Sequence, residues 1–126
     1  MVNYPLGDYL IQIKNIARAG KNEITVVSTK VIKSVSDVLK TEGFLESNKL
    51  EEGNLTSKLA IKNKQPVLFD LKLVSKPGLR IYKNFSEVKT RKDKSSILIL
   101  STSKGIMSST SAIKSRLGGE VIAEIY

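Results

Sequence analysis

Apolar residues recur every three or four positions in two segments of the N-terminal half, which is the spacing of one face of an α-helix. The first segment covers residues 6–17 and the second covers residues 31–39. Each is flanked by residues that favour helix ends: Pro5 and Gly20 for the first segment, Ser28 or Thr29 and Gly43 for the second. The pattern therefore predicts two amphipathic helices.

Short runs around these helices have the character of strands. Residues 23–27 are rich in β-branched side chains, which favour a strand. Residues 44–50 and 55–61 flank the turn sequence Glu51-Glu52-Gly53-Asn54 and together predict a hairpin. The order expected for this half is α-β-α-β-β, with both helices on one face of a small sheet.

The second half of the chain is dominated by strand patterns. In the predicted half-buried strand at 67–74, one face would carry Val67, Phe69, Leu71 and Leu73, which alternate with Leu68, Asp70, Lys72 and Val74. Ser75-Lys76-Pro77-Gly78 follows as a turn. The other expected elements are strands at 79–82, 97–100 and 120–126, a turn or strand at 85–88, and a helix within 109–117 capped by Ser109, Thr110 or Ser111.

The composition changes near residues 62–66, which is the best candidate for a boundary. We therefore expect an α+β fold of two small subdomains. Residues 1–66 would form the α-β-α-β-β part, and residues 67–126 a β-rich part with one short helix.

Several classes of function are excluded by composition. The 126 residues contain no Cys, His or Trp, so a zinc finger, a haem ligand, a thiol nucleophile and a Ser-His-Asp triad cannot be built. The carboxylates are scattered, and no phosphate-binding loop accompanies them. We expect a protein that is not an enzyme, without metal, cofactor or small-molecule substrate. The longest aliphatic run is residues 97–100, so we also expect a soluble chain with no membrane partner.

The formal net charge of +9 points towards an anionic partner. Residues 76–94 alone carry seven basic side chains against Glu87 and Asp93. A phosphate backbone is attracted to such a surface through counterion release. A solvated, solubilising face explains the same charge, so charge alone leaves nucleic-acid binding as one of two alternatives.

One polar stretch has the chemistry that RNA recognition needs. Ser101-Thr102-Ser103-Lys104-Gly105, which we call the hydroxyl loop, follows directly on a predicted buried strand. Hydroxyls both donate and accept, and can therefore meet base edges, phosphates and the ribose 2′-hydroxyl. A polar connector between a strand and a helix is the structural alternative.

Two further motifs have both a functional and a structural interpretation. Gly118-Gly119-Glu120 would let a nucleotide lie against main chain, or would simply stop a helix and start a strand. Lys76, Pro77 and Gly78, with Arg80 and Tyr82, would offer a rigid turn, cations and an aromatic ring on which a base or sugar could stack. A hairpin turn with a core tyrosine explains the same residues.

Taken together, these motifs resemble ribosomal protein eight of the bacterial-type small subunit. The resemblance lies in residues 75–82, in the run Ser-Thr-Ser-Lys-Gly-Ile-Met at 101–107 and in the Gly-Gly-Glu at 118–120, in the same order and spacing. Residues 5–8, 13–15, 39–40 and 42–44 are similar to the same family, so the resemblance extends over essentially the whole chain.

The resemblance implies a structural protein of the small ribosomal subunit, located in a cytoplasmic or organellar ribosome. Its expected partners are the central domain of 16S-type rRNA, neighbouring ribosomal proteins and, as a translational repressor, its own mRNA; a non-ribosomal basic RNA-binding module is the alternative. In this family the hydroxyl loop meets a distorted RNA core, where Glu120 would accept from a base amino group or order the loop. The implied rRNA-binding residues are Ser101, Thr102, Ser103, Lys104, Gly105, Gly119, Glu120, Lys76, Pro77, Gly78, Tyr82, Lys30 and Asn15.

Overall fold

The computed structural model describes residues 4–91 and 96–126, and it has the α+β architecture expected from the sequence. The chain forms two compact units. Residues 5–70 make up the first unit, whereas Tyr4 belongs with residues 71–126 in the second. The chain therefore divides after Asp70. The residues at which the composition changes lie within a small hairpin of the first unit, made of β4 (Ile61–Lys62) and β5 (Gln65–Pro66).

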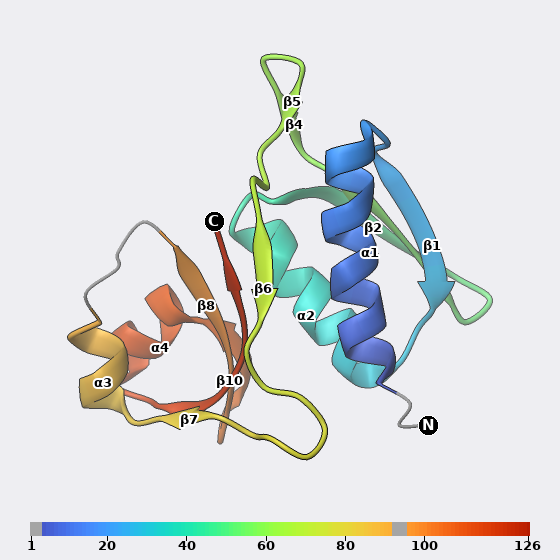
Figure 1. Ribbon diagram of the computed structural model, residues 1–126. Helices are drawn as coiled ribbons and strands as arrows, with labels where there is room; N and C mark the ends of the chain where they lie inside the picture. The colour runs from blue at the N-terminus through green and yellow to red at the C-terminus, as the bar shows by residue number, and fades with distance from the viewer. Residues whose placement is uncertain (1–3, 92–95) are drawn as a thin grey trace. The chain divides into compact units, whose positions relative to one another are not determined.

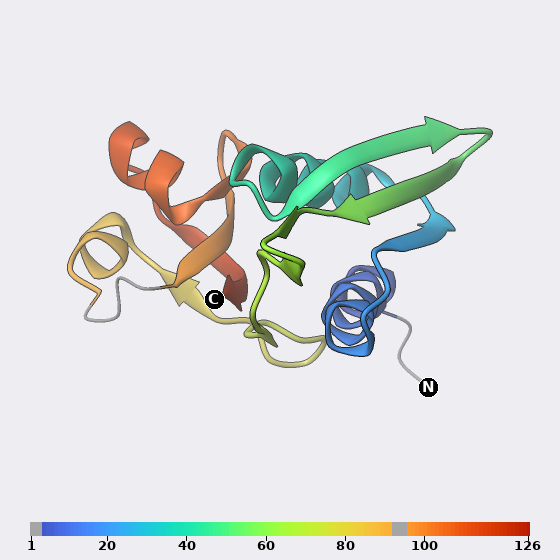
Figure 2. The ribbon, with the colours of Figure 1, turned by 90° about the horizontal axis from the view of Figure 1, so that it is seen from above.

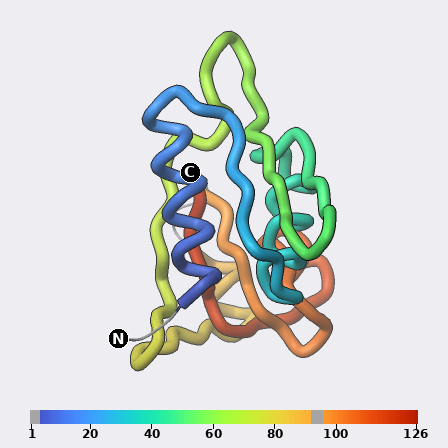
Figure 3. Tube along the Cα trace, turned by 90° about the vertical axis from the view of Figure 1, so that its right-hand side faces the viewer, coloured from blue at the N-terminus to red at the C-terminus, as the bar shows by residue number. Residues whose placement is uncertain are grey.

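The first unit is a three-stranded antiparallel sheet with two helices. The sheet has the strand order β1-β3-β2, and β2 and β3 form the long hairpin seen from above in Figure 2. The β4–β5 hairpin projects from this unit as a narrow loop (Figures 1 and 3). The main elements are α1 (Pro5–Ala19), β1 (Glu23–Val27), α2 (Lys30–Thr41), β2 (Leu45–Glu51) and β3 (Asn54–Leu59).

Local signals in the sequence determine where α2 begins. Of the two caps considered, Thr29 is the one used: its side-chain oxygen accepts from the backbone N–H of Ile32 at 3.2 Å. This bond satisfies one of the N–H groups that the first turn leaves without a helical partner. After the helix, Gly43 has a φ of 89°, a conformation that is easy for glycine.

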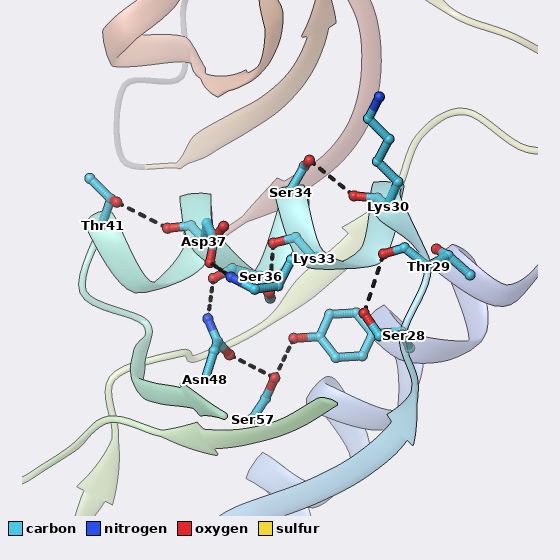
Figure 4. Close-up of polar contacts among 11 residues, drawn as sticks. Ser28, Thr29, Lys30, Lys33, Ser34, Ser36, Asp37, Thr41, Asn48 and Ser57 are labelled. Atoms are coloured by element: carbon cyan, nitrogen blue, oxygen red, sulfur yellow. Dashed lines mark hydrogen bonds and ion pairs between the residues drawn. The ribbon is translucent and has the colours of Figure 1, made fainter. Parts of the chain in front are cut away.

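A chain of hydrogen bonds joins both helices to the same face of the sheet (Figure 4). The Asn48 amide nitrogen of β2 donates to the carbonyl of Ser36 in α2 at 2.8 Å. The Ser57 hydroxyl of β3 donates to the Asn48 side-chain oxygen, also at 2.8 Å. Because Ser57 uses its hydrogen there, the Tyr9 hydroxyl of α1 donates to Ser57, at 2.7 Å. This buried chain fixes how the helices and strands are aligned.

Tyr9→Phe tests this chain of hydrogen bonds. Burial raises the pKa of Tyr9 to about 12, although its bond to Ser57 lowers it somewhat. The hydroxyl therefore keeps its proton in the folded state well above pH 10, where an unfolded tyrosine ionises. Its contribution to stability is complete below pH 10 and is lost as the pH rises towards 12. We expect the substitution to lower the free energy of unfolding by about 1 kcal/mol at pH 8.

At pH 11 the two proteins should differ less in free energy of unfolding, because only the wild-type protein loses the contribution of the Tyr9 hydroxyl. Urea unfolding at both pH values measures the two differences, and all other titrating groups are shared by the two proteins. An equal difference at pH 8 and pH 11 would contradict the protonated, buried phenol.

The second unit is an antiparallel sheet packed against two short helices. Strand β10 lies at its centre and pairs with β6, β7 and β8, and β8 also pairs with β9. Val88 from α3 and Ala112 from α4 pack with Leu98, Leu100 and Val121 from the sheet in a buried core. The elements are β6 (Leu71–Leu73), β7 (Tyr82–Lys83), α3 (Phe85–Lys89), β8 (Ile97–Thr102), β9 (Gly105–Ser108), α4 (Ser109–Ser115) and β10 (Gly119–Ile125), drawn in yellow to red in Figure 1.

Four local expectations in residues 67–111 are wrong. The strand expected at 79–82 is reduced to β7, which begins only at Tyr82. Residues 85–88 are neither turn nor strand but lie in α3, which begins with a capping box in which Asn84 and Glu87 bond each other's backbone N–H groups. Helix α4 is capped by Ser108, one residue before the expected candidates. The alternating stretch 67–74 becomes a strand only at 71–73, and Phe69, expected on the buried face, is 83% exposed. None of the described helices is both long and apolar enough to span a bilayer.

Candidate nucleic-acid interface

The hydroxyl loop connects two strands rather than a strand and a helix. Its residues form the end of β8, a tight turn and the start of β9, with Thr102 paired to Gly105. The Thr102 hydroxyl donates to the carbonyl of Gly105 at 2.7 Å and accepts from the N–H of Lys104 at 3.2 Å. Gly105 has a φ of 112°, which a residue with a Cβ rarely adopts. The turn is thus held by Thr102 and Gly105.

This geometry separates the roles of the three hydroxyls. Thr102 uses its side chain to shape the turn, so it acts on a ligand mainly through the loop conformation. Ser103 and Lys104 are exposed at the tip, and the Ser103 hydroxyl has no hydrogen-bond partner among the described residues. Ser101 lies half-buried in β8. The groups available to an RNA are therefore Ser103, Lys104 and the half-buried hydroxyl of Ser101.

The Gly-Gly-Glu motif brings three strands together. Glu120 of β10 is paired on one side with Ser101 of β8 and on the other side with Tyr82 of β7. A Cβ added to Gly119 would lie 2.1 Å from the carbonyl oxygen of Ser101, and one added to Gly118 would lie 2.4 Å from that of Lys83. Both glycines thus allow neighbouring main chain, within this unit, to approach β10. Close strand packing alone is enough to require them.

The Lys76-Pro77-Gly78 turn has the geometry expected from its sequence. Lys76 and Leu79 exchange two backbone hydrogen bonds of 2.8 and 2.9 Å, and Gly78 has a φ of 85°. Proline followed by a glycine of positive φ is typical of a type II turn. The buried Ser75 fixes the far side, because its hydroxyl oxygen accepts from the N–H of Ile81 at 3.0 Å. This connects the turn firmly to the strand that carries Tyr82.

Tyr82 is an exposed side chain and not a core residue. Its side chain is 66% exposed, although its backbone pairs with Glu120 in the sheet. An exposed ring beside a polar loop is the arrangement on which an unpaired base can stack. The sequence alone left the core tyrosine as an alternative, and the structure excludes it.

Arg80, one of the cations of the sequence motif, contacts Tyr4, which the sequence did not single out. Arg80 donates from Nη1 to Oε2 of Glu120 at 3.1 Å, and this bond raises the pKa of the guanidinium above its ordinary value. The Cζ of Arg80 lies 5.9 Å from the centre of the Tyr4 ring. Partial burial raises the pKa of the Tyr4 hydroxyl. No local pattern around Tyr4 marks it, since its contacts lie more than seventy residues away in the sequence.

The basic stretch 76–94 is not a uniform cationic surface. Arg91 donates to the hydroxyl and to the carbonyl of Ser96 at 2.8 and 2.7 Å, and lies 3.6 Å from Glu124. Only 12% of its side chain is exposed, so it stabilises the fold rather than meeting a ligand. Lys76 and Lys89 are exposed, whereas Lys92 and Lys94 of this stretch lie outside the described residues.

Two of the implied residues, Asn15 and Lys30, lie in the other unit. Asn15 is exposed on α1, and Lys30 is the exposed first residue of α2. Figure 4 shows the Lys30 side chain extending away from the hydrogen-bonded chain of Ser36, Asn48 and Ser57. The other implied residues lie in the second unit, along β7, β8, β9, β10 and the turn before β7. Contacts of all the implied residues with RNA, in either unit, remain a prediction.

Comparison with known proteins gives one consistent family. The sequence model of the family "Ribosomal protein S8" matches residues 4–126. "Small ribosomal subunit protein uS8" of Nitratidesulfovibrio vulgaris strain DP4 is 38% identical over 126 residues, which is the full length of both chains. The protein of the same name from Hydrogenovibrio crunogenus is 40% identical over 125 residues, or 96% of this chain and 95% of the relative. "Small ribosomal subunit protein uS8c" of Tupiella akineta is 34% identical over the whole of both chains.

Proposed function

This chain belongs to the ribosomal protein S8 family, and we propose that it is a structural protein of the small ribosomal subunit that binds the central domain of the rRNA directly. It is not an enzyme. Its place is the ribosome, either in the cytoplasm or in an organelle, as with the relative from Tupiella akineta. Its partners would be the rRNA and neighbouring proteins of the subunit.

The observation that carries the rRNA-binding proposal is the arrangement around β10. One antiparallel sheet brings the exposed tip of the hydroxyl loop, the exposed Tyr82 ring and the Lys76–Gly78 turn into a single unit. Hydroxyls and a stacking ring are the groups that recognise irregular or unpaired RNA, whose bases are accessible outside a regular helix. A regular A-form helix hides its base edges in a narrow major groove, so we propose an irregular junction as the target.

Charge supports the same unit as the main RNA-binding part. Residues 71–126 contain eleven basic and four acidic side chains, whereas residues 1–70 contain ten and eight. The second unit therefore holds a net charge of +7 out of the total of +9. Lysines on this unit would supply salt-sensitive attraction to phosphates, and the loop and ring would supply the preference for one RNA shape.

Filter binding of the purified full-length chain tests the proposal. The probes are a central-domain fragment of small-subunit rRNA containing the junction and an unrelated hairpin of equal length. At about 0.15 M salt we expect the fragment to bind at least tenfold tighter, because non-specific attraction weakens with salt while the hydroxyl contacts remain. Equal binding of both RNAs would contradict the proposal.

If the leader of its own mRNA folds into a structure like the rRNA site, the protein would bind it and repress its own translation. Adding the leader of its own mRNA to the same assay as a competitor measures this. Displacement of the rRNA fragment by the leader, but not by the unrelated hairpin, supports repression. A leader that fails to compete contradicts repression while leaving the rRNA-binding proposal intact.

A further inference from the structure

Arg80 lies between a carboxylate and an aromatic ring. Its guanidinium bonds to Glu120 at 3.1 Å and lies 5.9 Å from the centre of the Tyr4 ring. Tyr4 is itself held in place, because its hydroxyl donates to the carbonyl oxygen of Ser75 at 3.3 Å. A guanidinium with an ionic partner and a ring partner is less free to turn towards a phosphate.

Glu120 occupies an unexpected place for an acidic side chain. It is paired with Ser101 and Tyr82, so it lies at the centre of the proposed RNA-binding surface. That surface belongs to the unit with the higher positive charge, and an unpaired carboxylate there would repel a phosphate backbone. Its side chain is 20% exposed, whereas that of Arg80 is 47% exposed. The Glu120 carboxylate is thus less accessible to an RNA than the Arg80 guanidinium with which it is paired.

The other acidic side chains described in residues 71–126 lie elsewhere. Glu87 closes the capping box of α3. Glu124 accepts from the Ser96 hydroxyl at 2.7 Å, and it is paired with Leu98, whose side chain lies in the core with α3 and α4. Among these described residues, Glu120 is therefore the acid that lies beside the hydroxyl loop.

The sequence left two roles open for Glu120, and the structure favours a third. Its side chain bonds to Arg80, and among the described residues it makes no hydrogen bond to a side chain of the hydroxyl loop. A cation that is already neutralised adds little to sequence-independent attraction, which grows with the number of phosphates that the protein neutralises. Discrimination improves whenever affinity for the wrong partner is lowered.

We propose that Glu120 is a specificity-determining residue, which pairs with Arg80 and so cancels one positive charge beside the hydroxyl loop, lowering affinity for RNA of the wrong shape. This inference rests on the proposed rRNA-binding function. Affinity at this part of the surface then depends on fit more than on charge.

A charge cycle tests the inference with Glu120→Gln, Arg80→Ala and the double variant, all as full-length chains. The probe is the unrelated hairpin, in filter binding at several salt concentrations. Glu120→Gln frees Arg80, so it should bind about sixfold tighter at about 0.1 M salt, with a salt slope steeper by about 0.7–0.9. Arg80→Ala should bind more weakly than wild type, because it leaves an unpaired carboxylate. The double variant should bind the hairpin as tightly as wild type does, because positions 80 and 120 together carry no net charge in either protein.

The inference requires that the rRNA fragment gain less from Glu120→Gln than the hairpin does, so that the preference for the fragment falls. Glu51→Gln is the matched control: it frees Lys49, paired with Glu51 at 2.9 Å in the other unit, and adds the same charge. It should change binding of the hairpin less than twofold.

Three results would overturn the inference: unchanged hairpin binding by Glu120→Gln, an equal gain from Glu51→Gln, or a double variant as weak as Arg80→Ala. Circular dichroism of each variant confirms that the fold is kept. If the wild-type chain does not prefer the fragment, the proposed function fails. If it does prefer the fragment but the variants do not follow the expected order, only the role of Glu120 fails.

Discussion

Gly119→Ala is expected to lower the free energy of unfolding by about 3 kcal/mol or more, at the upper end of what overpacking costs. The added Cβ would lie 2.1 Å from the carbonyl oxygen of Ser101, and that oxygen belongs to main chain and cannot rotate away. Either β10 moves off β8 or the hydroxyl loop is displaced. Affinity for the rRNA fragment should therefore fall at least a hundredfold. The urea concentration at the midpoint of unfolding should also fall.

Gly53→Ala provides the control for this prediction. Gly53 lies in the β2–β3 turn with a φ of 81°, and an added Cβ there would meet no atom within 4 Å. That substitution carries only the cost of a left-handed backbone, about 1–2 kcal/mol. Similar losses of stability in the two variants would show that close approach of β8 and β10 is not what requires Gly119.

Ser103→Ala is expected to weaken binding of the rRNA fragment about ten- to a hundredfold, which corresponds to about 1–3 kcal/mol. Ser103 lies exposed at the tip of the hydroxyl loop, and its hydroxyl bonds to none of the described residues. Removing the hydroxyl should leave the fold unchanged, and on the proposed function it would deprive a buried RNA group of its partner. The urea midpoint should stay the same, and the unrelated hairpin should bind as it does to wild type.

Lys104→Ala, one residue further along, separates shape recognition from charge. Lys104 is exposed at the same tip. Loss of Lys104 should lower the affinity for both RNAs to a similar extent, about sixfold at about 0.1 M salt. It should also reduce the slope of log affinity against log salt by about 0.7–0.9. If Ser103→Ala also lowers the affinity for both RNAs equally, the Ser103 hydroxyl does not contribute to recognition of RNA shape.

Local signals in the sequence predicted the elements whose ends are set by their own residues. The stripes of α1 and α2, the cap at Thr29 and the turn at Lys76–Gly78 depend on neighbours within four positions. The capping box of Asn84 and Glu87 was also present in the sequence and predicts a helix start, so α3 could have been found. A capping box is enough to start a helix here, although α3 is only five residues long.

Residues 67–70 show why alternation alone misleads. The pattern placed Phe69 on the buried face, yet Leu68 is 2% exposed and Phe69 is 83% exposed. Asp70 is held by Lys14 and Arg18 of α1, at 3.5 and 3.2 Å. These ion pairs join residues more than fifty positions apart in the sequence, so no local pattern contains the information that ends the first unit at this point.

The sequence by itself determined the family, the excess of positive charge, the two main helices and the hydroxyl loop, because composition, periodicity and short motifs are local properties. Only the tertiary structure decided which residues surround the loop. Pairing of β7 and β8 with β10 places Glu120 beside Ser101 and Tyr82, and packing brings Arg80 to Glu120 and Tyr4. Strand pairing and ion pairing over long sequence distances depend on the whole fold, and they determine which polar groups of the described residues are left exposed.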